Sequence, residues 1–518
     1  MRAADPRPSR SRRPRRLLRL RTATLLLAAG VGTAQAEDPR PDVALTLADV
    51  VSATLGSNPD IQAATEQVDA ARGVLTSAGT AFDTYLVSDG SAGRMHGTDP
   101  LRGLEAIQKQ VSYRIALERV FRNGITVTPE VGLARNSFST LPGSATSNAG
   151  SVALTVGVPL MRDRGGASTV AAERAAGHDY EATRLALRHT RAASVLSSVV
   201  SYWDYLAAQQ RLEVLRSSEE RAQRIADQTR VLVQAEERTA TDLTQTLGNL
   251  AAKRVTRIAA EQGLVEARQQ LGLAVGWPAE RFPTLPPPGT AFPEPSPSAS
   301  AASAADLLSD VFARRPDLAA AEEGVASAQT QVNAAHSELR PRLDLVVTGG
   351  YRSSEPGLGF NDFFSPLYRR GPRPDATFQF RYTLPVSNAY ARGLLLQTSA
   401  LSEQRRLARD DLRRHIASGV VVASEALARG RAGVRESAEA VRLLEATVQA
   451  EQRKFQLGVA TLFDVIQAED ALTSARLGQI QSRRNHAAAI AALRFQTGTL
   501  ITGEGEPATV DLTALQSP

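Results

Sequence analysis

Leu45–Leu86 reads LTLADVVSATLGSNPDIQAATEQVDAARGVLTSAGTAFDTYL, and Ala302–Leu343 reads ASAADLLSDVFARRPDLAAAEEGVASAQTQVNAAHSELRPRL. In each stretch a Pro-Asp pair opens an alanine-rich segment that runs into a strand pattern, and the two prolines lie 257 positions apart (316 − 59). Proline is favoured at the first position of a helix, so each pair predicts a helix start. Two long copies differ from a solenoid, whose units are about 20–50 residues long. The chain is therefore expected to contain one structural unit twice.

A second correspondence links the later part of each copy at an offset of 222 residues. It matches Thr239–Leu243 (TATDL) with Thr461–Val465 (TLFDV), and Leu271–Gly276 with Leu493–Gly498. Thr239 with Asp242, and Thr461 with Asp464, have the spacing of a capping box, in which a threonine and an acid together begin a helix. Two helices of unusual length are expected in each copy, over 168–234 with 243–275 and over 396–456 with 464–496.

The first 36 residues have the order of a secretory signal peptide. An arginine-rich start is followed by the short apolar run Thr22–Val31 and by Ala34-Gln35-Ala36, a small-residue cleavage site. The start holds nine of the 60 basic residues and one of the 54 acidic ones, so its removal changes the formal charge from +6 to −2 (51 − 53). The mature chain therefore has no basic excess of the kind that nucleic-acid binding requires, and no nucleic-acid partner is expected.

Composition also excludes several kinds of chemistry. The chain has no cysteine, which excludes disulfides, thiolate metal sites and a cysteine nucleophile. Its six histidines show no pair at metal-ligand spacing, and no nucleophile–base constellation or phosphate-binding motif stands out. We expect no enzyme activity, no cofactor and no metal site.

The remaining chain divides into two repeats. Short helices are expected at 45–57 and 59–80, and again at 303–314 and 316–338. The first repeat is expected to cover 37–284 and the second 303–498, with a Pro/Ser/Ala linker at 285–302 and a C-terminal tail at 499–518.

Strand patterns follow each pair of short helices. Phe378, Phe380, Tyr382 and Leu384 alternate with polar residues, and the same alternation runs through 343–351, 125–133 and 152–158. This pattern fits either an ordinary half-buried sheet or a membrane barrel. Secretion, wholly apolar faces and Gly/Ser/Pro-rich connections at 137–149 and 353–374 favour the barrel. Phe360, Phe363, Phe364 and Tyr368 are expected to form either an aromatic girdle or a loop plug.

The order of these segments resembles the TolC-type outer-membrane efflux channels. The specific matches are Val158–Arg162 (VPLMR) after the strands, Tyr202-Trp203-Asp204 in the first long helix, and Leu457–Val465 (LGVATLFDV) between the last two helices. The resemblance covers essentially the whole mature chain.

This resemblance implies an α+β membrane protein: a homotrimer whose protomers jointly close one outer-membrane β-barrel, continued by a long α-helical tunnel in the periplasm, with an internal two-fold structural repeat. The implied function is the passive exit duct of a tripartite efflux or type I secretion system, working with a periplasmic adaptor and an inner-membrane pump and contacting outer-membrane lipid. The family's usual number is four barrel strands per protomer. Here Tyr113–Val120 and Ile125–Ala134 add a hairpin that either joins the barrel or folds outside it.

The resemblance also directs attention to the tips of the long helices. In the family the tunnel narrows there and aspartates ring the pore, so Asp464 is a pore-gate candidate, together with Gln467, which replaces a second aspartate, and Asp242 of the first copy. For both aspartates a purely capping role stays open. The family's arginine in this turn is replaced by Ala460, and the first tip lacks the glycine found at Gly458. Residues expected to contact the adaptor are Glu236, Arg238, Thr239, Gly458, Val459, Ala460 and Thr461.

An alternative function remains open. The chain could be a soluble periplasmic coiled-coil adaptor or scaffold, in which the alternating strands form an ordinary soluble sheet. Membrane fractionation separates the two, because a salt wash would release the adaptor but not a barrel.

Overall fold

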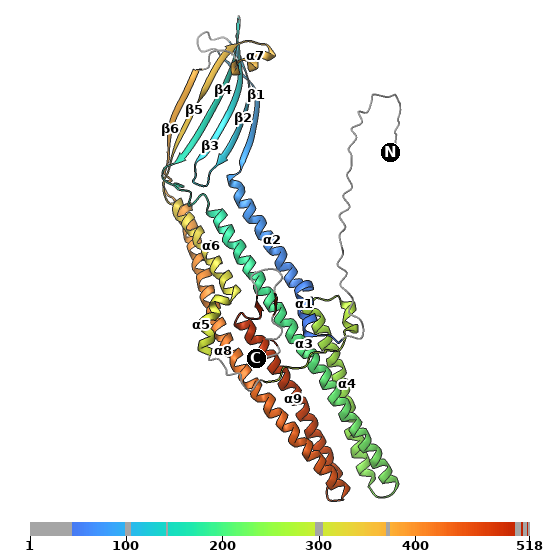
Figure 1. Cartoon of the computed structure of the whole chain (residues 1–518). Helices are drawn as coiled ribbons and strands as arrows, with labels where there is room; N and C mark the ends of the chain where they lie inside the picture. Colours follow the sequence, from blue (N-terminus) through green and yellow to red (C-terminus); the bar gives the residue numbers. More distant parts are fainter. Residues whose placement is uncertain are drawn as a thin grey trace, which may run out of the picture. The chain divides into compact units, whose positions relative to one another are not determined.

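The computed structural model describes residues 44–98, 105–140, 143–295, 304–368, 373–502, 509–510 and 515, so the expected signal peptide lies outside the described residues. Ala44–Pro518 is one compact unit (Figure 1). Its helices are α1 (Leu47–Ser57), α2 (Pro59–Gly79), α3 (Ala171–Gln234), α4 (Ala240–Val275), α5 (Ala304–Arg314), α6 (Pro316–Glu338), α7 (Phe360–Phe364), α8 (Ala389–Gln456) and α9 (Leu462–Gln496). Its main strands are β1 (Thr84–Thr98), β2 (Glu105–Val120), β3 (Thr126–Thr140), β4 (Gly143–Pro159), β5 (Arg342–Pro356) and β6 (Arg373–Thr383).

The eight helices expected from the sequence are confirmed, seven of them to within three residues at each end, and α8 begins seven residues earlier than expected. Local signals explain their starts: Thr46 and Asp49 form a capping box at α1, and Asn58 accepts hydrogen bonds from the first amides of α2, whose first residue is Pro59. Helices α3 and α8 have 64 and 68 residues, so each is about 100 Å long at 1.5 Å per residue.

The six main strands form one antiparallel meander in the order β1-β2-β3-β4-β5-β6. Each neighbouring pair keeps one register along its length, from Thr84 opposite Arg119 in β1–β2 to Arg352 opposite Arg373 in β5–β6. The extra hairpin left open by the sequence therefore joins this sheet, as β2 and β3. The segment predicted as the first repeat supplies four strands and the segment predicted as the second supplies two, so the two segments differ in their strands.

The expected connections at 137–149 and 353–374 were too long. Strand β3 continues to Thr140, β4 begins at Gly143 and β5 continues to Pro356. Small polar residues extend these strands because their hydroxyl groups hydrogen-bond across the ladder, as between Ser147 Oγ and Ser354 Oγ at 2.8 Å. Gly, Ser and Thr in this chain therefore continue strands where composition alone predicts loops.

The constant register divides the sheet into two faces, because side chains alternate along each strand. We call one the apolar face; several of its side chains are well exposed, among them Phe378 at 70%. Its large members are Leu86, Val111, Tyr113, Ile115, Leu117, Val127, Val131, Leu133, Val152, Leu154, Val156, Val158, Leu343, Leu345, Val347, Tyr351, Phe378, Phe380 and Tyr382. The opposite, polar face carries Asp89, Arg114, Glu118, Glu130, Asp344, Arg352, Asp375, Gln379 and Arg381.

The loop between β5 and β6 folds back onto the apolar side of the sheet. Arg135 Nη2 donates to the Gly359 carbonyl at 2.6 Å, and Asn148 Nδ2 donates to the Gly357 carbonyl at 2.9 Å. Pro366 lies so close to Gly150 that a Cβ there would approach it to 2.9 Å. Phe363 of α7 lies over Arg135, with the guanidinium 5.3 Å from the ring centroid, so the loop is on the side away from Arg114 and its charged neighbours. The aromatic girdle and the loop plug both stay predictions.

The helices pack around one main core. Tyr202, Trp203, Val199 and Leu271 are buried there, and Tyr202 Oη donates to the Leu45 carbonyl at 3.1 Å. Burial agrees with a packing role for Trp203. Among the described residues, none of the helices combines the length and apolarity needed to span a membrane.

Two ion pairs join the repeats through α3 and α9. Arg484 binds Asp204 through both guanidinium arms, at 2.6 and 2.7 Å, and Arg221 Nε lies 2.7 Å from Glu469 Oε2. A bidentate arginine–carboxylate pair fixes orientation as well as distance. The joint therefore sets how the α3–α4 hairpin lies beside the α8–α9 hairpin.

Candidate functional site at the helix tips

The turns that end the two long hairpins have the same backbone structure. Glu237 N donates to the Leu232 carbonyl at 2.9 Å, and Val459 N donates to the Lys454 carbonyl at the same distance. Each turn is followed by a threonine cap, Thr239 at α4 and Thr461 at α9. The 222-residue offset read from the sequence therefore relates these turns residue by residue.

Glu236 occupies the position that corresponds to Gly458. Both residues have left-handed backbone conformations, with φ of 59° for Glu236 and 74° for Gly458. Left-handed conformations are uncommon for residues other than glycine, asparagine and aspartate. The first tip has no glycine at this position, yet its turn is the same, because Glu236 adopts the strained left-handed conformation.

The side chains of the two tips differ in chemistry. The first tip presents Glu236, Glu237 and Arg238, whereas the second presents Gly458, Val459 and Ala460. Leu457 and Val459 are 79% and 78% exposed, and Phe463 beside them is also exposed. The chain therefore carries one charged tip and one apolar tip with the same backbone structure.

Asp464 caps helix α9. Its Oδ2 accepts hydrogen bonds from Thr461 N at 2.8 Å and Thr461 Oγ1 at 2.7 Å, and its own N–H donates to Thr461 Oγ1. The hydrogen bond from the Thr461 side chain, then that from its backbone, lowers the pKa of Asp464 below its ordinary value. Asp242 forms the same capping box with Thr239. The capping interpretation is thus observed for both aspartates.

Gln467 follows Asp464 by three residues on α9 and is exposed. Gln245 follows Asp242 at the same spacing on α4, a correspondence that the sequence reading missed although the 222-residue offset contained it. Both returning helices therefore begin with threonine, aspartate and glutamine at equal intervals. The aspartate and glutamine lie on neighbouring turns of one helix face.

A groove of about 790 Å³ runs between α3 and the α8–α9 hairpin beside the tips. Ile225 and Leu232 line one wall, and Phe455, Leu462 and Val465 line the other. The Arg238 guanidinium lies 5.2 Å from the Phe455 ring centroid, so the charged tip contacts the helix that leads to the apolar tip. The sequence could not predict this groove, because helical periodicity does not say which hairpins become neighbours.

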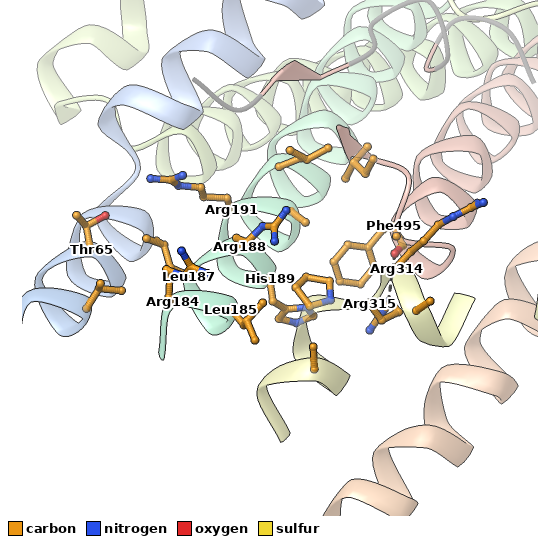
Figure 2. Close-up of a pocket in the computed structure, with 18 of the residues that line it drawn as sticks. Thr65, Arg184, Leu185, Leu187, Arg188, His189, Arg191, Arg314, Arg315 and Phe495 are labelled. Carbon is orange, nitrogen blue, oxygen red and sulfur yellow. Dashed lines mark hydrogen bonds between the residues drawn. The ribbon is translucent and has the colours of Figure 1, made fainter. Parts of the chain in front are cut away.

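A second pocket, of about 730 Å³, lies where α3, α6 and the end of α9 meet (Figure 2). Its arginines are engaged: Arg315 binds Asp317, with Nη2 2.6 Å from Oδ2, and donates to the Phe495 carbonyl at 3.1 Å. Burial works to raise the pKa of Asp317, but the hydrogen bonds and charge of Arg315 hold it below its ordinary value. We assign this pocket to the joint between the repeats.

The Asp464 cap predicts a local pH dependence. A carboxylate whose pKa is lowered on folding stabilises the fold above its unfolded pKa, about 3.9, and loses that effect as pH falls through the folded value. Amide exchange in the first turn of α9, corrected for intrinsic rates, should therefore accelerate below about pH 4. In Asp464→Asn this acid-induced change should vanish, while the Thr239 cap of α4 serves as an internal reference. An identical acid response in the variant would contradict the assignment.

Comparison with known proteins identifies the family. The family model for outer membrane efflux proteins matches residues 101–277 and 307–499. Pyoverdine export outer membrane protein OpmQ of Pseudomonas putida is 26% identical over 322 residues, which are 57% of this chain and 61% of OpmQ. The match thus spans less than two thirds of that relative.

Solved structures share the fold at low sequence identity. The outer-membrane channel OprN is 17% identical, with a TM-score of 0.66 over 88% of this chain and 90% of OprN. The Campylobacter jejuni CmeC outer membrane channel is 14% identical, with a TM-score of 0.65 over 88% and 85% of the two chains. The outer membrane protein VceC of Vibrio cholerae is 15% identical, with a TM-score of 0.65 over 87% and 96%. Since the family model matches well over half of its residues, this chain belongs to the outer membrane efflux protein family.

Proposed function

We propose that this protein is a trimeric outer-membrane channel, the exit duct of a tripartite efflux or type I secretion system. The observation that carries the proposal is a sheet with one exposed apolar face that continues into two hairpins of long helices, in a chain of the outer membrane efflux family. The sheet would lie in the outer membrane and the hairpins would extend into the periplasm.

The sheet favours a membrane over a soluble scaffold. Phe378, Phe380 and Tyr382 are all more than half exposed, and they lie beside further apolar side chains on neighbouring strands. Soluble monomers rarely expose an apolar patch of this extent. A lipid-facing sheet must pair all of its backbone groups, so it has to close into a barrel. One chain leaves β1 and β6 at the edges of its sheet, and further copies would close it.

The tips favour a protein partner in the periplasm. Leu457, Val459 and Phe463 form an apolar surface at the end of the α8–α9 hairpin, next to the groove between α3 and α8–α9. We assign this surface to the tip of a periplasmic adaptor, which would connect the channel to an inner-membrane pump. The charged tip, with Glu236 and Arg238, would contact the adaptor through charged groups and not through an apolar surface.

Asp464 is also proposed to act at the pore. Three-fold symmetry would bring three copies of its carboxylate toward one axis, with the three copies of Gln467 one turn further along the helix. Like charges in a narrow passage attract cations and repel anions. The capping hydrogen bonds observed for Asp464 are compatible with this role, since a carboxylate that caps a helix keeps its charge.

The pore role can be tested in planar bilayers. The wild-type protein should form channels that prefer cations, and Asp464→Asn should reduce the cation-to-anion permeability ratio severalfold while folding survives, because asparagine is nearly isosteric and also caps helices. Asp242→Asn shows whether the first tip shares the role, and Asp411→Asn, in the first half of α8, controls for net charge. If the selectivity of Asp464→Asn is unchanged, Asp464 acts only as a helix cap. If the wild-type protein gives no conductance, the proposal that it forms a channel is wrong.

Adaptor docking can be tested by giving the apolar tip the chemistry of the charged tip. The double variant Leu457→Ala, Val459→Glu carries the residues found at Ala235 and Glu237, on a backbone that already accepts them. Loss of two exposed apolar contacts should weaken docking by at least about tenfold, since 1.4 kcal/mol is a factor of ten. Export, measured in cells with the cognate pump and adaptor, should fall while outer-membrane abundance stays constant.

The reciprocal variant Glu237→Val removes a charge from the charged tip and adds an apolar residue, so a fall in its export at normal abundance would show that this tip also contributes to docking. If the double variant exports normally at normal abundance, the apolar tip is not part of the docking surface.

A further inference from the structure

We infer that three copies of this chain close a barrel of eighteen strands, in which β1 of one copy pairs with β6 of the next. The inference rests on the proposed trimeric channel and goes beyond it. The family resemblance implies four strands per protomer and twelve in the barrel, whereas this chain supplies six. The outlet would therefore be wider than the family pattern implies.

The hairpin of β2 and β3 is an integral part of the sheet. Strand β2 pairs with β1 from Gly97–Ala106 to Thr84–Arg119, and β3 pairs with β4 from Thr126–Gly157 to Thr140–Gly143. In the observed sheet β2 and β3 lie between β1 and β4, so no ladder joins β1 to β4 directly. Because an unpaired backbone group is costly in a membrane, a hairpin that left the sheet would have to be replaced by a new ladder between β1 and β4.

The side chains of the hairpin match the two sides of a barrel wall. Tyr113, Ile115 and Val131 continue the apolar face between Leu86 on β1 and Val152 on β4. On the opposite side Arg114 bridges β1, β2 and β3, with Nη2 3.0 Å from Asp89 Oδ2 and Nη1 3.1 Å from Glu130 Oε2. Such charges belong on the water-filled side of a barrel.

The second repeat places its charges on the same side. Arg352 Nη2 lies 3.3 Å from Asp375 Oδ2, across β5 and β6. The register puts both residues on the polar face with Arg114. On the apolar face the charged residues Arg94, Lys109, Arg119, Arg135 and Glu355 lie toward the ends of the strands, and large apolar residues fill the middle. All six strands therefore share one polar side and one side with an apolar middle, as the wall of a membrane barrel requires.

The two edges of the sheet can meet in a neighbouring copy. Strand β1 leads away from the end of α2 and β6 leads back to the start of α8, so β1 and the next copy's β6 would be antiparallel. Leu86 of β1 and Phe380 of β6 both belong to the apolar face, and that face of β1 carries no charge from Thr84 to Ala92. An even strand number closes such a barrel without a parallel pair. Because diameter grows roughly linearly with strand number, the outlet would be about half as wide again as with twelve strands.

The seam can be tested with introduced cysteines, since the chain has none of its own. Leu86→Cys is combined in turn with Phe378→Cys, Phe380→Cys and Tyr382→Cys, all on the apolar face, in the full-length protein in membranes. Within one chain these positions lie at opposite edges of the sheet, so oxidation can join them only between copies. At least one combination should give covalent dimers and trimers on a denaturing gel. Val87→Cys in place of Leu86→Cys faces the other side and should give none, because a disulfide requires Cβ atoms about 4 Å apart.

Two further pairs test whether the hairpin lies within the wall. Leu86→Cys with Leu117→Cys, and Val131→Cys with Val152→Cys, are direct cross-strand partners and should form disulfides within one chain. The inference is overturned if these pairs stay reduced, if no β1–β6 pair links an intact trimer, or if Val131→Cys links to β6 of the next copy instead. A monomer by native mass spectrometry would instead refute the proposed trimer, so the two failures are distinguishable.

Discussion

The edges of the sheet are the constraint on which the rest of this structure depends. One face of β1–β6 is apolar and exposed, and the outer backbone edges of β1 and β6 have no strand partner among the described residues. A sheet of this kind is stable in lipid only when its edges are paired. If copies of the chain pair them, the same arrangement gathers the long helices of every copy around one axis. Barrel closure and tunnel assembly then become a single event.

The ion pairs between α3 and α9 fix the position of one helical hairpin beside the other, as far as the tips of the long helices. Asp204 with Arg484, and Arg221 with Glu469, tie the first repeat to the second along the hairpins. Partly buried pairs of this kind contribute orientation more than stability. They keep the charged tip beside the apolar tip, so that Arg238 lies over Phe455 and a groove forms between the hairpins. The difference between the tips is a property of side chains only, since both turns share one backbone.

Much of the fold could be predicted from the sequence. Prolines 59 and 316, the two Thr-x-x-Asp boxes and the apolar periodicity predicted the helices, because these signals act within a few residues. The strands were harder. The composition of Ser147 and its neighbours predicts a loop, although these residues extend β4 through hydrogen bonds to residues some two hundred positions away. Such distant contacts also determine three further features: the position of the β2–β3 hairpin in the sheet, the side of the sheet on which the β5–β6 loop lies, and the groove at the tips. The Thr-x-x-Asp spacing predicted that Asp464 caps a helix, and the structure shows this cap. Its proposed role at the pore rests on the family resemblance alone.

Electron cryomicroscopy of the full-length protein in lipid nanodiscs tests the central claim most directly. The account predicts three copies around one axis, a closed antiparallel barrel of eighteen strands within the lipid, and three charged and three apolar helix tips at the opposite end. A particle of one copy with an open sheet outside the lipid would contradict the channel. A closed trimer with twelve strands would retain the channel and contradict the place assigned to β2 and β3.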